Sequence, residues 1–359
     1  FWEYNKYMKI AVYTIALNEE QFVQRWYDSC KEADYLLIAD TGSVDKTVAK
    51  AKKLGINVHV ISIRPWRFDD ARNAALALLP DDIDYCISLD MDEMLAPGWR
   101  EEMEKAPAWA TRIRYDYTWN FNPNGTPGLT FGGDKIHARH GYRWVHPVHE
   151  CLYADRLEEK EYWSKLGLWH KADDTKSRGQ YLPLLKLSVE EDPYNDRNAY
   201  YYARELFFHG QLEEAKVQFE RHLSLPKATW RAERASSMRY IAKCSTDEEE
   251  KLKWWKKAMQ EEPNKREAYV ELAQYHYDNG RWGECLTLCK KALNVKDRQM
   301  DYLNEAFAWG SIPYDLAAVC AYWLGERTQA LEYGEKAVEL NPTDKRLNSN
   351  LEFYREGVK

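Results

Sequence analysis

Short apolar runs alternate with longer amphipathic stretches along the first third of the chain. The runs have the length and composition of buried strands, and the stretches between them show helical periodicity. The predicted strands are residues 9–15, 35–39, 58–62 and 84–89. The predicted helices are residues 19–30, 46–54 and 69–79, and we expect Asp69 or Asp70 to cap the third helix. This alternation predicts right-handed crossovers and a mostly parallel sheet.

The pattern changes from about residue 179, where the strands end and a helical repeat begins. Three similar segments carry a turn glycine followed five positions later by a small residue: residues 202–215, 272–285 and 317–330. A degenerate fourth copy has Ser245 in place of the glycine, and the last copy follows an insertion around residues 297–310. The period of roughly 34 residues resembles that of tetratricopeptide repeats, whose stacked helix pairs bury each other's faces. The alternative is an irregular helical bundle.

The composition excludes several classes of protein. With 25 Tyr, 15 Trp and 10 Phe among 359 residues, the chain has too many aromatic side chains to remain disordered. No stretch approaches the roughly 18 apolar residues of a membrane span, and the first residues lack the features of a secretory signal. The net charge of −7 provides no global basic field for nucleic acid. Seven scattered cysteines without a CxxC pair indicate neither a disulfide framework nor a cysteine-rich zinc site, so we expect a cytoplasmic protein.

The densest chemical signal follows the fourth predicted strand, where Asp90 and Asp92 are two positions apart. In an extended chain, residues i and i+2 point to the same side, so we expect both carboxylates to converge on one point. Two hard oxygen donors suit Mg²⁺ or Mn²⁺, with substrate phosphates completing the shell. Ligands of parallel sheets also collect at the carboxyl ends of the strands. The alternative is an acidic loop that caps the helix after Pro97.

Four motifs occur in order along this part of the chain: residues 14–20 (TIALNEE), 39–47 (ADTGSVDKT), 68–76 (FDDARNAAL) and 89–93 (LDMDE). Together they resemble the nucleotide-diphospho-sugar domain of family 2 glycosyltransferases, which has the GT-A fold. The resemblance spans residues 8 to about 170. It implies an activated sugar donor, a divalent metal (Mn²⁺ or Mg²⁺) and an inverting displacement. We therefore predict an α/β GT-A domain at residues 1–178 and an all-α tetratricopeptide-like domain at residues 179–359.

The same resemblance implies roles for individual residues. The donor-binding residues that it implies are Ala16, Leu17, Asn18, Glu19, Asp40, Arg72 and Asp90. Asp40 could accept the imide proton of the base, which favours uracil; the alternative is a turn-forming Asp before Gly42. Arg72 is a cation in the first turn of a helix, where the helix dipole disfavours it. We therefore expect an anion near Arg72. The resemblance places Asp90 near the ribose and makes Asp92 a metal ligand.

Five of the nine histidines lie between residues 137 and 170. Residues 144–150 (WVHPVHE) resemble the "W…VHE" segment of the repeat-bearing branch of these transferases. Residues 168–171 (LWHK) resemble a later segment whose histidine is the third metal ligand, which is His170 here. A neutral imidazole is a suitable ligand for such a cation.

Glu150 is the candidate base that deprotonates the acceptor. The alternative is a structural carboxylate that orients His149 or pairs with Arg143. A zinc site at His146 and His149 is a further possibility, although no companion cysteines occur at ligand spacing.

These features predict a metal-dependent, inverting glycosyltransferase whose donor is a nucleotide-diphosphate sugar such as UDP-glucose. We expect a polymer acceptor (protein, peptide or glycan) or a protein partner to bind the repeats, which could also form a homodimer. One rival is a repeat adaptor with an inactive transferase domain. Another is transfer to modified DNA bases, because residues 251–257 (KLKWWKK) mix cations and aromatics as nucleic-acid surfaces do. We favour an ordinary amphipathic repeat helix for that segment.

Overall fold

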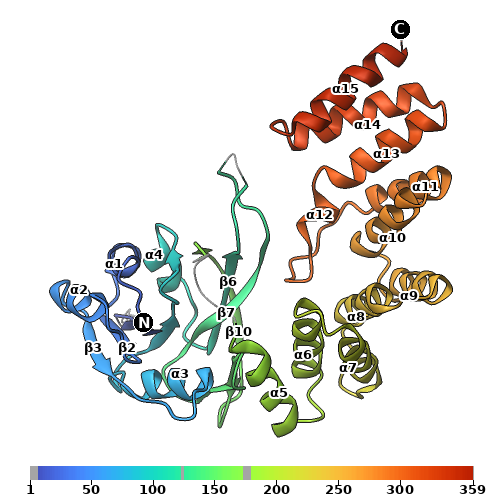
Figure 1. Cartoon of the computed structure of the whole chain (residues 1–359). Helices are drawn as coiled ribbons and strands as arrows, with labels where there is room; N and C mark the ends of the chain where they lie inside the picture. The colour runs from blue at the N-terminus through green and yellow to red at the C-terminus, as the bar shows by residue number, and fades with distance from the viewer. Residues whose placement is uncertain (1–6, 123–124, 173–178, 359) are drawn as a thin grey trace. The chain divides into compact units, whose positions relative to one another are not determined.

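The computed structural model describes residues 7–122, 125–172 and 179–358. The chain divides into two units, Phe1–Ser188 and Val189–Lys359, and each is considered by itself (Figure 1). The division falls within the helix α5 (Tyr181–Glu191). The domain boundary predicted after residue 178 adjoins residues 173–178, which lie outside the described residues, so that boundary stays a prediction.

The first unit is built on an eight-stranded sheet in the order β3-β2-β1-β4-β7-β6-β10-β5, with β8 and β9 forming a separate hairpin. The strands are β1 (Ile10–Ala16), β2 (Tyr35–Asp40), β3 (Asn57–Val60), β4 (Tyr85–Ser88), β5 (Glu93–Leu95), β6 (Arg112–Thr118), β7 (Thr130–Ala138), β8 (Tyr142–Val145), β9 (Cys151–Ala154) and β10 (Glu161–His170). Pairing is parallel from β3 to β4 and between β6 and β10, and antiparallel at the other three junctions. The sheet is therefore mixed but mostly parallel, which confirms the prediction.

The four predicted strands and three predicted helices of this unit are present, with shifted ends. The helices before α5 are α1 (Val23–Cys30), α2 (Thr47–Lys53), α3 (Phe68–Ala77) and α4 (Trp99–Glu104). Helix α1 begins later than predicted, because Phe22 N donates to Glu19 O (2.9 Å) in a turn that precedes it. The predicted cap of α3 is wrong: Arg67 occupies the N-cap position and no side chain caps the helix. Asp69 instead pairs with Arg67, with 2.9 Å between Oδ2 and Nη2.

Both faces of the sheet are buried, because successive residues of the parallel strands point to two different hydrophobic clusters. Ile10 and Val12 of β1 pack with Trp26 of α1 in one cluster. Tyr13 of β1 packs with Leu76 of α3 in the other. Continuous apolar runs are typical of strands covered on both faces. This packing holds the carboxyl ends of β1, β2 and β4 in fixed positions relative to one another.

The described residues of the second unit form helices and connecting segments, with no strand. Its helices are α6 (Asp196–Phe208), α7 (Leu212–Ser224), α8 (Arg231–Cys244), α9 (Glu248–Glu261), α10 (Glu267–Asp278), α11 (Trp282–Asn294), α12 (Ala306–Trp309), α13 (Ile312–Trp323), α14 (Arg327–Leu340) and α15 (Lys345–Val358). Four antiparallel pairs, α6/α7, α8/α9, α10/α11 and α13/α14, correspond to the four predicted copies. Gly210, Gly280 and Gly325 lie in the connecting turns with φ of +74°, +68° and +82°, which only glycine adopts freely.

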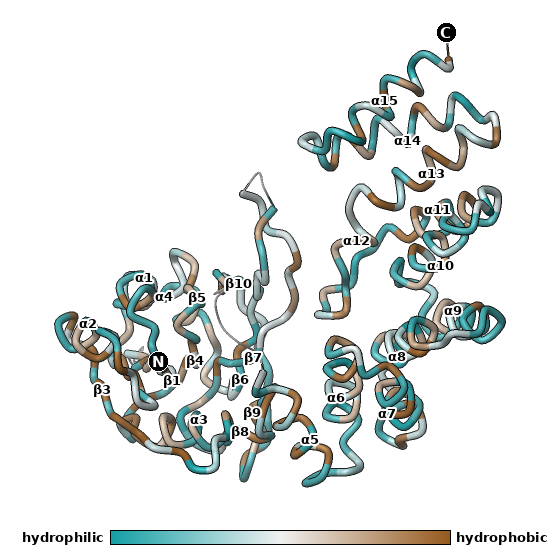
Figure 2. Tube along the Cα trace, viewed as in Figure 1, coloured by the Kyte–Doolittle hydropathy of each residue, from teal (hydrophilic) through white to brown (hydrophobic). Residues whose placement is uncertain are grey.

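The remaining features of the repeat also agree with the sequence. Ser245 follows α8 in an extended conformation, without the left-handed turn of the other copies. The insertion around residues 297–310 contains the short helix α12, and the helix that follows it, α13, is mostly apolar (brown in Figure 2). Cys285 and Cys289 are both buried in α11. Within the described part of the chain, no helix combines the length and the apolar character needed to cross a lipid bilayer.

Candidate active site

The first two motifs meet where β1 and β2 end, and hydrogen bonds join them into one rim. Asn18 N donates to Ser43 Oγ (2.8 Å), and Asn18 Oδ1 accepts from Val44 N (2.9 Å). Glu19 N donates to Thr47 Oγ1 (2.8 Å). Asn18 has a φ of +55°, a left-handed conformation that Asn tolerates better than most residues. The two loops therefore form a single polar surface at the edge of the sheet.

Asp40 is the last residue of β2 and is buried, with 1% of its surface exposed. Its Oδ1 atom accepts from Gly42 N (3.0 Å) and Ser43 N (2.9 Å), so the turn-forming role considered for this residue is present. Its Oδ2 atom is buried and has no hydrogen-bond partner among the described residues. A buried acceptor without a partner costs about 1–3 kcal/mol. Oδ2 is therefore an acceptor that a ligand donor could satisfy.

The other residues predicted to bind the donor base surround this position. Ala16 ends β1, and its carbonyl oxygen accepts from Thr41 N (2.9 Å). The Leu17 side chain is half exposed, at 52%. Glu19 is buried. The structure thus brings Ala16, Leu17, Asn18, Glu19 and Asp40 together at one edge of the sheet.

The second part of the site is a cluster of charged side chains, and Arg72 of α3 lies at its centre. Its guanidinium contacts Asp90 (Nη2 to Oδ1, 2.8 Å), Glu150 (Nε to Oε1, 2.5 Å) and Ser88 (Nη1 to Oγ, 3.0 Å). The Arg72 side chain is only 7% exposed, and two anions contact it where one was expected. The reason given for that expectation is wrong, because α3 begins at Phe68 and Arg72 is its fifth residue, beyond the first turn. Glu150 pairs with Arg72. Arg143, which the sequence suggested as its partner, pairs instead with Asp155, with 3.6 Å between Arg143 Nε and Asp155 Oδ2.

Sequence reasoning missed Lys135 of β7 and the role of Glu93. Lys135 Nζ lies 2.7 Å from Asp90 Oδ2 and 3.0 Å from Glu93 Oε1. Glu93 is 1% exposed and also accepts from Tyr117 Oη (2.8 Å) and from Asp90 N (2.8 Å). Glu93 belongs to the fourth motif and could have been found there. Nothing in the sequence around Lys135 indicates that it contacts residues 42 and 45 positions away.

The charges of this cluster alternate from Glu150 through Arg72, Asp90 and Lys135 to Glu93. Burial by itself would raise the pKa of the Asp90 carboxyl, but the charges of Arg72 and Lys135 hold that pKa well below its usual range. Burial raises the pKa of Glu93, although Lys135 opposes the shift. Since each oxygen of Asp90 already faces a cation, Asp90 is a poor candidate for a metal ligand.

Asp90 and Asp92 do not lie on an extended strand, so the reason given for their convergence is wrong. Strand β4 ends at Ser88, and residues 90–93 form a turn in which Glu93 N donates to Asp90 O (2.9 Å). Asp90 faces Arg72 and Lys135, whereas Asp92 faces a different partner, described below. The alternative role, capping the helix after Pro97, is also absent: α4 follows Gly98 without a side-chain cap.

His170 ends β10 and faces Asp92, with 3.7 Å between Nε2 and Oδ2. Its Nδ1 atom lies 3.1 Å from Trp119 O, and its ring stacks on the Trp119 ring at 4.3 Å between centroids. Burial would lower the pKa of His170, but the hydrogen bond and charge of Asp92 raise it. Asp92 and His170 are therefore brought together from two distant parts of the sequence.

These two side chains fit part of a divalent-metal site. Among the residues that the structure describes, no group of three or more His, Cys, Asp and Glu side chains is placed to hold a metal ion. A carboxylate and an imidazole together supply two ligands of the kinds that Mn²⁺ accepts. The remaining ligands would have to come from outside the chain, which is consistent with a site completed by phosphate oxygens.

The segment 144–150 comprises the end of β8 and the connection to β9, and it is attached to α3. Asn73, next to Arg72, donates from Nδ2 to Trp144 O (2.9 Å) and accepts at Oδ1 from Trp144 N (2.8 Å). The Arg72 guanidinium lies over the Trp144 ring at 5.0 Å. Phe68 N donates to Pro147 O (2.9 Å). The third motif therefore both supplies Arg72 and positions the segment that carries Glu150.

Two other histidines of this region, His137 and His149, contact aromatic side chains of the first unit. His137 is fully buried between Tyr13 Oη (3.1 Å from Nε2) and Ala138 O (2.8 Å from Nδ1), and burial lowers its pKa to about 4. The His149 ring lies edge-on to Tyr181 at 5.6 Å. His146 and His149 have left-handed backbones, with φ of +79° and +50°. No third ligand joins these two histidines among the described residues, so the zinc alternative has no support in the structure.

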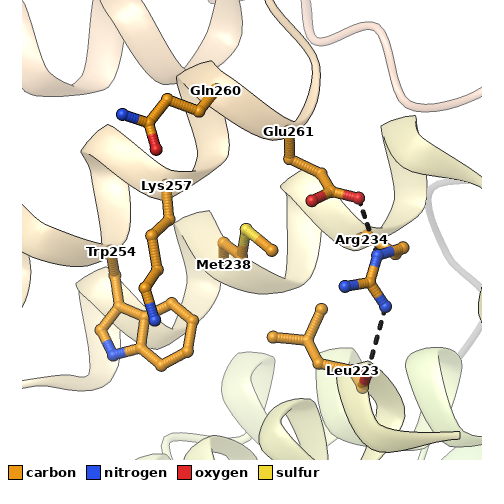
Figure 3. A pocket seen from close by; sticks show the side chains of 7 residues that line it. All are labelled: Leu223, Arg234, Met238, Trp254, Lys257, Gln260 and Glu261. Atoms are coloured by element: carbon orange, nitrogen blue, oxygen red, sulfur yellow. Dashed lines mark hydrogen bonds and ion pairs between the residues drawn. The ribbon is translucent and has the colours of Figure 1, made fainter.

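A hollow of about 390 Å³ lies in the second unit, and Figure 3 shows the residues that line it. Arg234 donates to Glu261 Oε1 (2.7 Å) and to Leu223 O (3.1 Å) on one side, and Trp254 with Lys257 lies on the other. Lys257 Nζ lies 4.1 Å from the Trp254 ring. The basic, aromatic segment 251–257 is part of α9, as favoured from the sequence. The hollow lacks paired acids with a histidine, so we place the candidate active site at the strand ends.

Residues 11–128, about a third of the chain, match the family model described as glycosyl transferase family 2. An uncharacterized glycosyltransferase of Rickettsia conorii is 33% identical over 109 residues, which are 30% of this chain and 37% of the relative. One of Rickettsia bellii is 31% identical over 109 residues, 30% of this chain and 35% of the relative. The chain thus spans little more than a third of the length of the curated relatives it matches.

Solved structures similar to this chain resemble about half of it. The MamA structure has a TM-score of 0.36 at 14% identity and covers 45% of this chain and 86% of its own. The tetratricopeptide protein TTC0263 of Thermus thermophilus has a TM-score of 0.31 at 17% identity and covers 49% of this chain and 88% of its own. Yeast Tom70 has a TM-score of 0.39 at 15% identity and covers 51% of this chain and 37% of its own. Likenesses this distant carry no functional argument.

Proposed function

We propose that the glycosyl transferase family 2 domain at residues 11–128 acts, with residues up to His170, as a metal-dependent inverting glycosyltransferase. The observation that carries the proposal is the pair of contacts from Arg72 to Asp90 and to Glu150, because it joins the predicted donor site to the predicted base. The donor is a nucleotide-diphosphate sugar, with a UDP-sugar such as UDP-glucose favoured. The acceptor is a polymer, either a protein or peptide or a glycan.

The preference for uracil is supported by Asp40. Its buried Oδ2 atom lacks a partner among the described residues, and the imide N–H of uracil is a donor that would satisfy it. The rim of Ala16 to Glu19 would face the same base. Asp90, held at both oxygens by cations, would contact the ribose rather than a metal.

Asp92 and His170 would hold Mn²⁺ or Mg²⁺, which when bound supplies positive charge to the leaving diphosphate. Transferases of this family generally depend on a divalent metal. Trp119 holds the His170 ring in place by stacking and by its carbonyl, so the imidazole is oriented before any ligand arrives.

Glu150 would accept the proton of the acceptor nucleophile as that oxygen, nitrogen or sulfur forms its bond to the anomeric carbon and the bond to the diphosphate breaks. Arg72 holds Oε1 of Glu150 and so fixes the direction in which the other oxygen points. Positioning of this kind contributes to catalysis because the reacting groups lose less freedom on the way to the transition state.

The test is to measure transfer from UDP-glucose to an acceptor in variants of the full chain. Glu150→Gln keeps the shape and removes the basicity, so the transfer rate should fall by roughly a hundredfold or more with donor affinity retained. Asp92→Ala should abolish metal-dependent donor turnover, and EDTA should do the same to the wild type. Asp81→Ala, whose side chain is 93% exposed, is the matched control. Undiminished activity in EDTA would contradict the metal assignment.

The helical unit would bind the polymer acceptor or a protein partner, and a homodimer through it stays a prediction. The rival in which the chain is an adaptor with an inactive transferase domain predicts no hydrolysis of nucleotide sugars at any metal concentration. Slow donor hydrolysis with Mn²⁺, lost in Asp92→Ala, would separate the two. If the acceptor is DNA instead, the affinity of the chain for DNA should fall steeply with added salt.

A further inference from the structure

The insertion between α11 and α13 lies back along the earlier helix pairs of the second unit. We call residues 297–310 the strap, and we call the surface formed by α6, α8 and the start of α10 the first-helix face. Figure 1 shows the chain before α12 running toward the end of α6. The contacts given below reach three successive helix pairs, so the strap is more than a local turn between its neighbours.

Two acids of the strap bind cations of the first-helix face. Both carboxylate oxygens of Asp301 accept from Lys265 Nζ at 2.6 Å, and Lys265 lies two residues before the start of α10. Glu305 Oε1 lies 2.6 Å from Arg239 Nη2 of α8. Lys265 and Arg239 are only 5% and 3% exposed. Charged hydrogen bonds of this kind are stronger than neutral ones, so these two pairs hold the strap at its middle.

Aromatic side chains complete the attachment. The Tyr302 ring stacks on the Tyr201 ring of α6, at 5.9 Å between centroids and 14° between planes. Tyr302 Oη donates to Glu233 Oε2 of α8 (2.6 Å). Trp309 Nε1 donates to Glu267 Oε1 of α10 (2.9 Å). The strap therefore lies on the first-helix face as a bound polypeptide would. Asp301, Tyr302 and Glu305 each contact a side chain of the face that complements it.

The same face carries a further cation on α6. Arg204 of α6 lies over the Tyr201 ring at 4.7 Å, and its Nε atom is buried without a hydrogen-bond partner among the described residues. No carboxylate pairs with Arg204 in the part of the chain that the structure describes. Lys265 thus pairs with the strap, and Arg239 pairs with both the strap and Glu271 of α10. Arg204, in contrast, has no carboxylate partner among the described residues.

We propose that the first-helix face is an interaction surface for an acidic, tyrosine-containing polypeptide segment, and that the strap is its internal occupant, which such a partner displaces. An attached segment competes at an effective concentration in the millimolar range, so the face stays covered until a partner makes additional contacts. Arg204 is the additional contact that the face offers. This proposal is independent of the transferase activity.

The first test uses a fluorescein-labelled peptide with the sequence of residues 297–309 and measures its anisotropy with the full chain. The variant Asp301→Asn/Glu305→Gln weakens the resident strap but leaves Lys265 and Arg239 intact. We expect this variant to bind the peptide at least tenfold more tightly than the wild type. Adding Arg239→Met should remove the gain. Glu352→Gln, which changes an exposed acid paired with Arg355 on α15, should bind as the wild type does.

Equal binding by the wild type and the strap variant would overturn the proposal. A second measurement needs no variant: hydrogen exchange of the full chain, with and without an excess of the unlabelled peptide. We expect strap amides to exchange faster than those of α10, and at least tenfold faster again with peptide, because displacement exposes them. The opposite result would be strap amides that exchange as slowly as those of α10 and at the same rate with peptide. It would show that the strap is a permanent part of the fold, and it would also overturn the proposal.

Discussion

At the scale of single residues, the site depends on buried charges that neutralise one another. Arg72 stands between Asp90 and Glu150, and Lys135 stands between Asp90 and Glu93. Removing charges from water is costly, and only good geometry with opposite charges offsets that cost. Each member of the cluster therefore depends on its neighbours, and removing one leaves another uncompensated.

We predict that Arg72→Met destabilises the chain strongly. The change leaves Glu150, with a side chain 10% exposed, and the partly buried Asp90 short of a cation, which should lower the free energy of unfolding by about 3–5 kcal/mol. Arg355→Met removes a cation from an exposed pair with Glu352 and should cost less than about 1 kcal/mol. Urea denaturation of both variants measures the difference. Equal effects would mean that the Arg72 contacts are not part of a stabilising network.

His137 provides a pH-dependent prediction, because burial lowers its pKa to about 4. The unfolded chain, with a histidine pKa of about 6.5, binds the proton first as the pH falls. Stability should therefore decrease between about pH 6.5 and pH 4, by up to roughly 3 kcal/mol. His137→Gln removes the titration, so the difference in unfolding free energy between wild type and variant should change with pH across that window. A difference that stays constant would contradict the assignment.

At the scale of elements, local patterns predicted four of the ten strands in the described residues (β1–β4), three helices of the first unit and the helical repeat, and tertiary contacts adjusted their ends. The central strands are recognisable because apolar runs are needed where both faces of a sheet are covered. The cap of α3 was wrong because Asp69 pairs with Arg67 rather than with the helix backbone. The turn at residues 90–93 replaced the expected extended chain because Glu93, buried beneath it, accepts from Asp90 N.

Replacing Gly280, in the turn before α11, and Gly283, within α11, by alanine should change the stability in opposite directions. Gly280 has a φ of +68°, so Gly280→Ala should lower the free energy of unfolding by about 1 kcal/mol or more. Gly283 lies in α11 with nothing within 4 Å of an added Cβ atom, so Gly283→Ala should raise it by about 0.5–1 kcal/mol. Thermal unfolding of the two variants gives the sign of each change. A stabilising Gly280→Ala would show that the turn does not need glycine.

At the scale of the whole molecule, the two units have separate hydrophobic cores. Trp26, Ile87 and Leu168 belong to the core of the first unit, and Cys285 and Leu316 belong to that of the second. Each core is built from residues of one unit alone. Domains of this kind can unfold in separate transitions, and a ligand stabilises only the transition of the unit that binds it.

We predict two transitions in scanning calorimetry of the full chain, and UDP-glucose with Mn²⁺ should raise only that of the first unit. At a ligand concentration about 100 times its Kd, the stabilisation is about 2.7 kcal/mol. In Asp92→Ala the shift should be much smaller, whereas Asp81→Ala should retain it. A shift confined to the second transition would place the nucleotide sugar on the helical unit and contradict the site described above.

The sequence by itself determined the features that depend on neighbours along the chain: the alternating strands and helices, the repeat with its turn glycines, and the polar residues that follow each strand. Local periodicity and backbone preference are enough for these. The order of the four motifs also indicated which strand ends carry the candidate site, since parallel strands bring those ends to one edge.

Only the tertiary structure decided which charges meet. Lys135 reaches Asp90 because β7 pairs antiparallel with β4, and Glu150 reaches Arg72 because Asn73 attaches the segment before β9 to α3. The same holds for the strap, whose acids Asp301 and Glu305 pair with Lys265 and Arg239, which are distant in the sequence. Ion pairs act over a few ångströms of space whatever the separation along the chain, so no local pattern of residues records them.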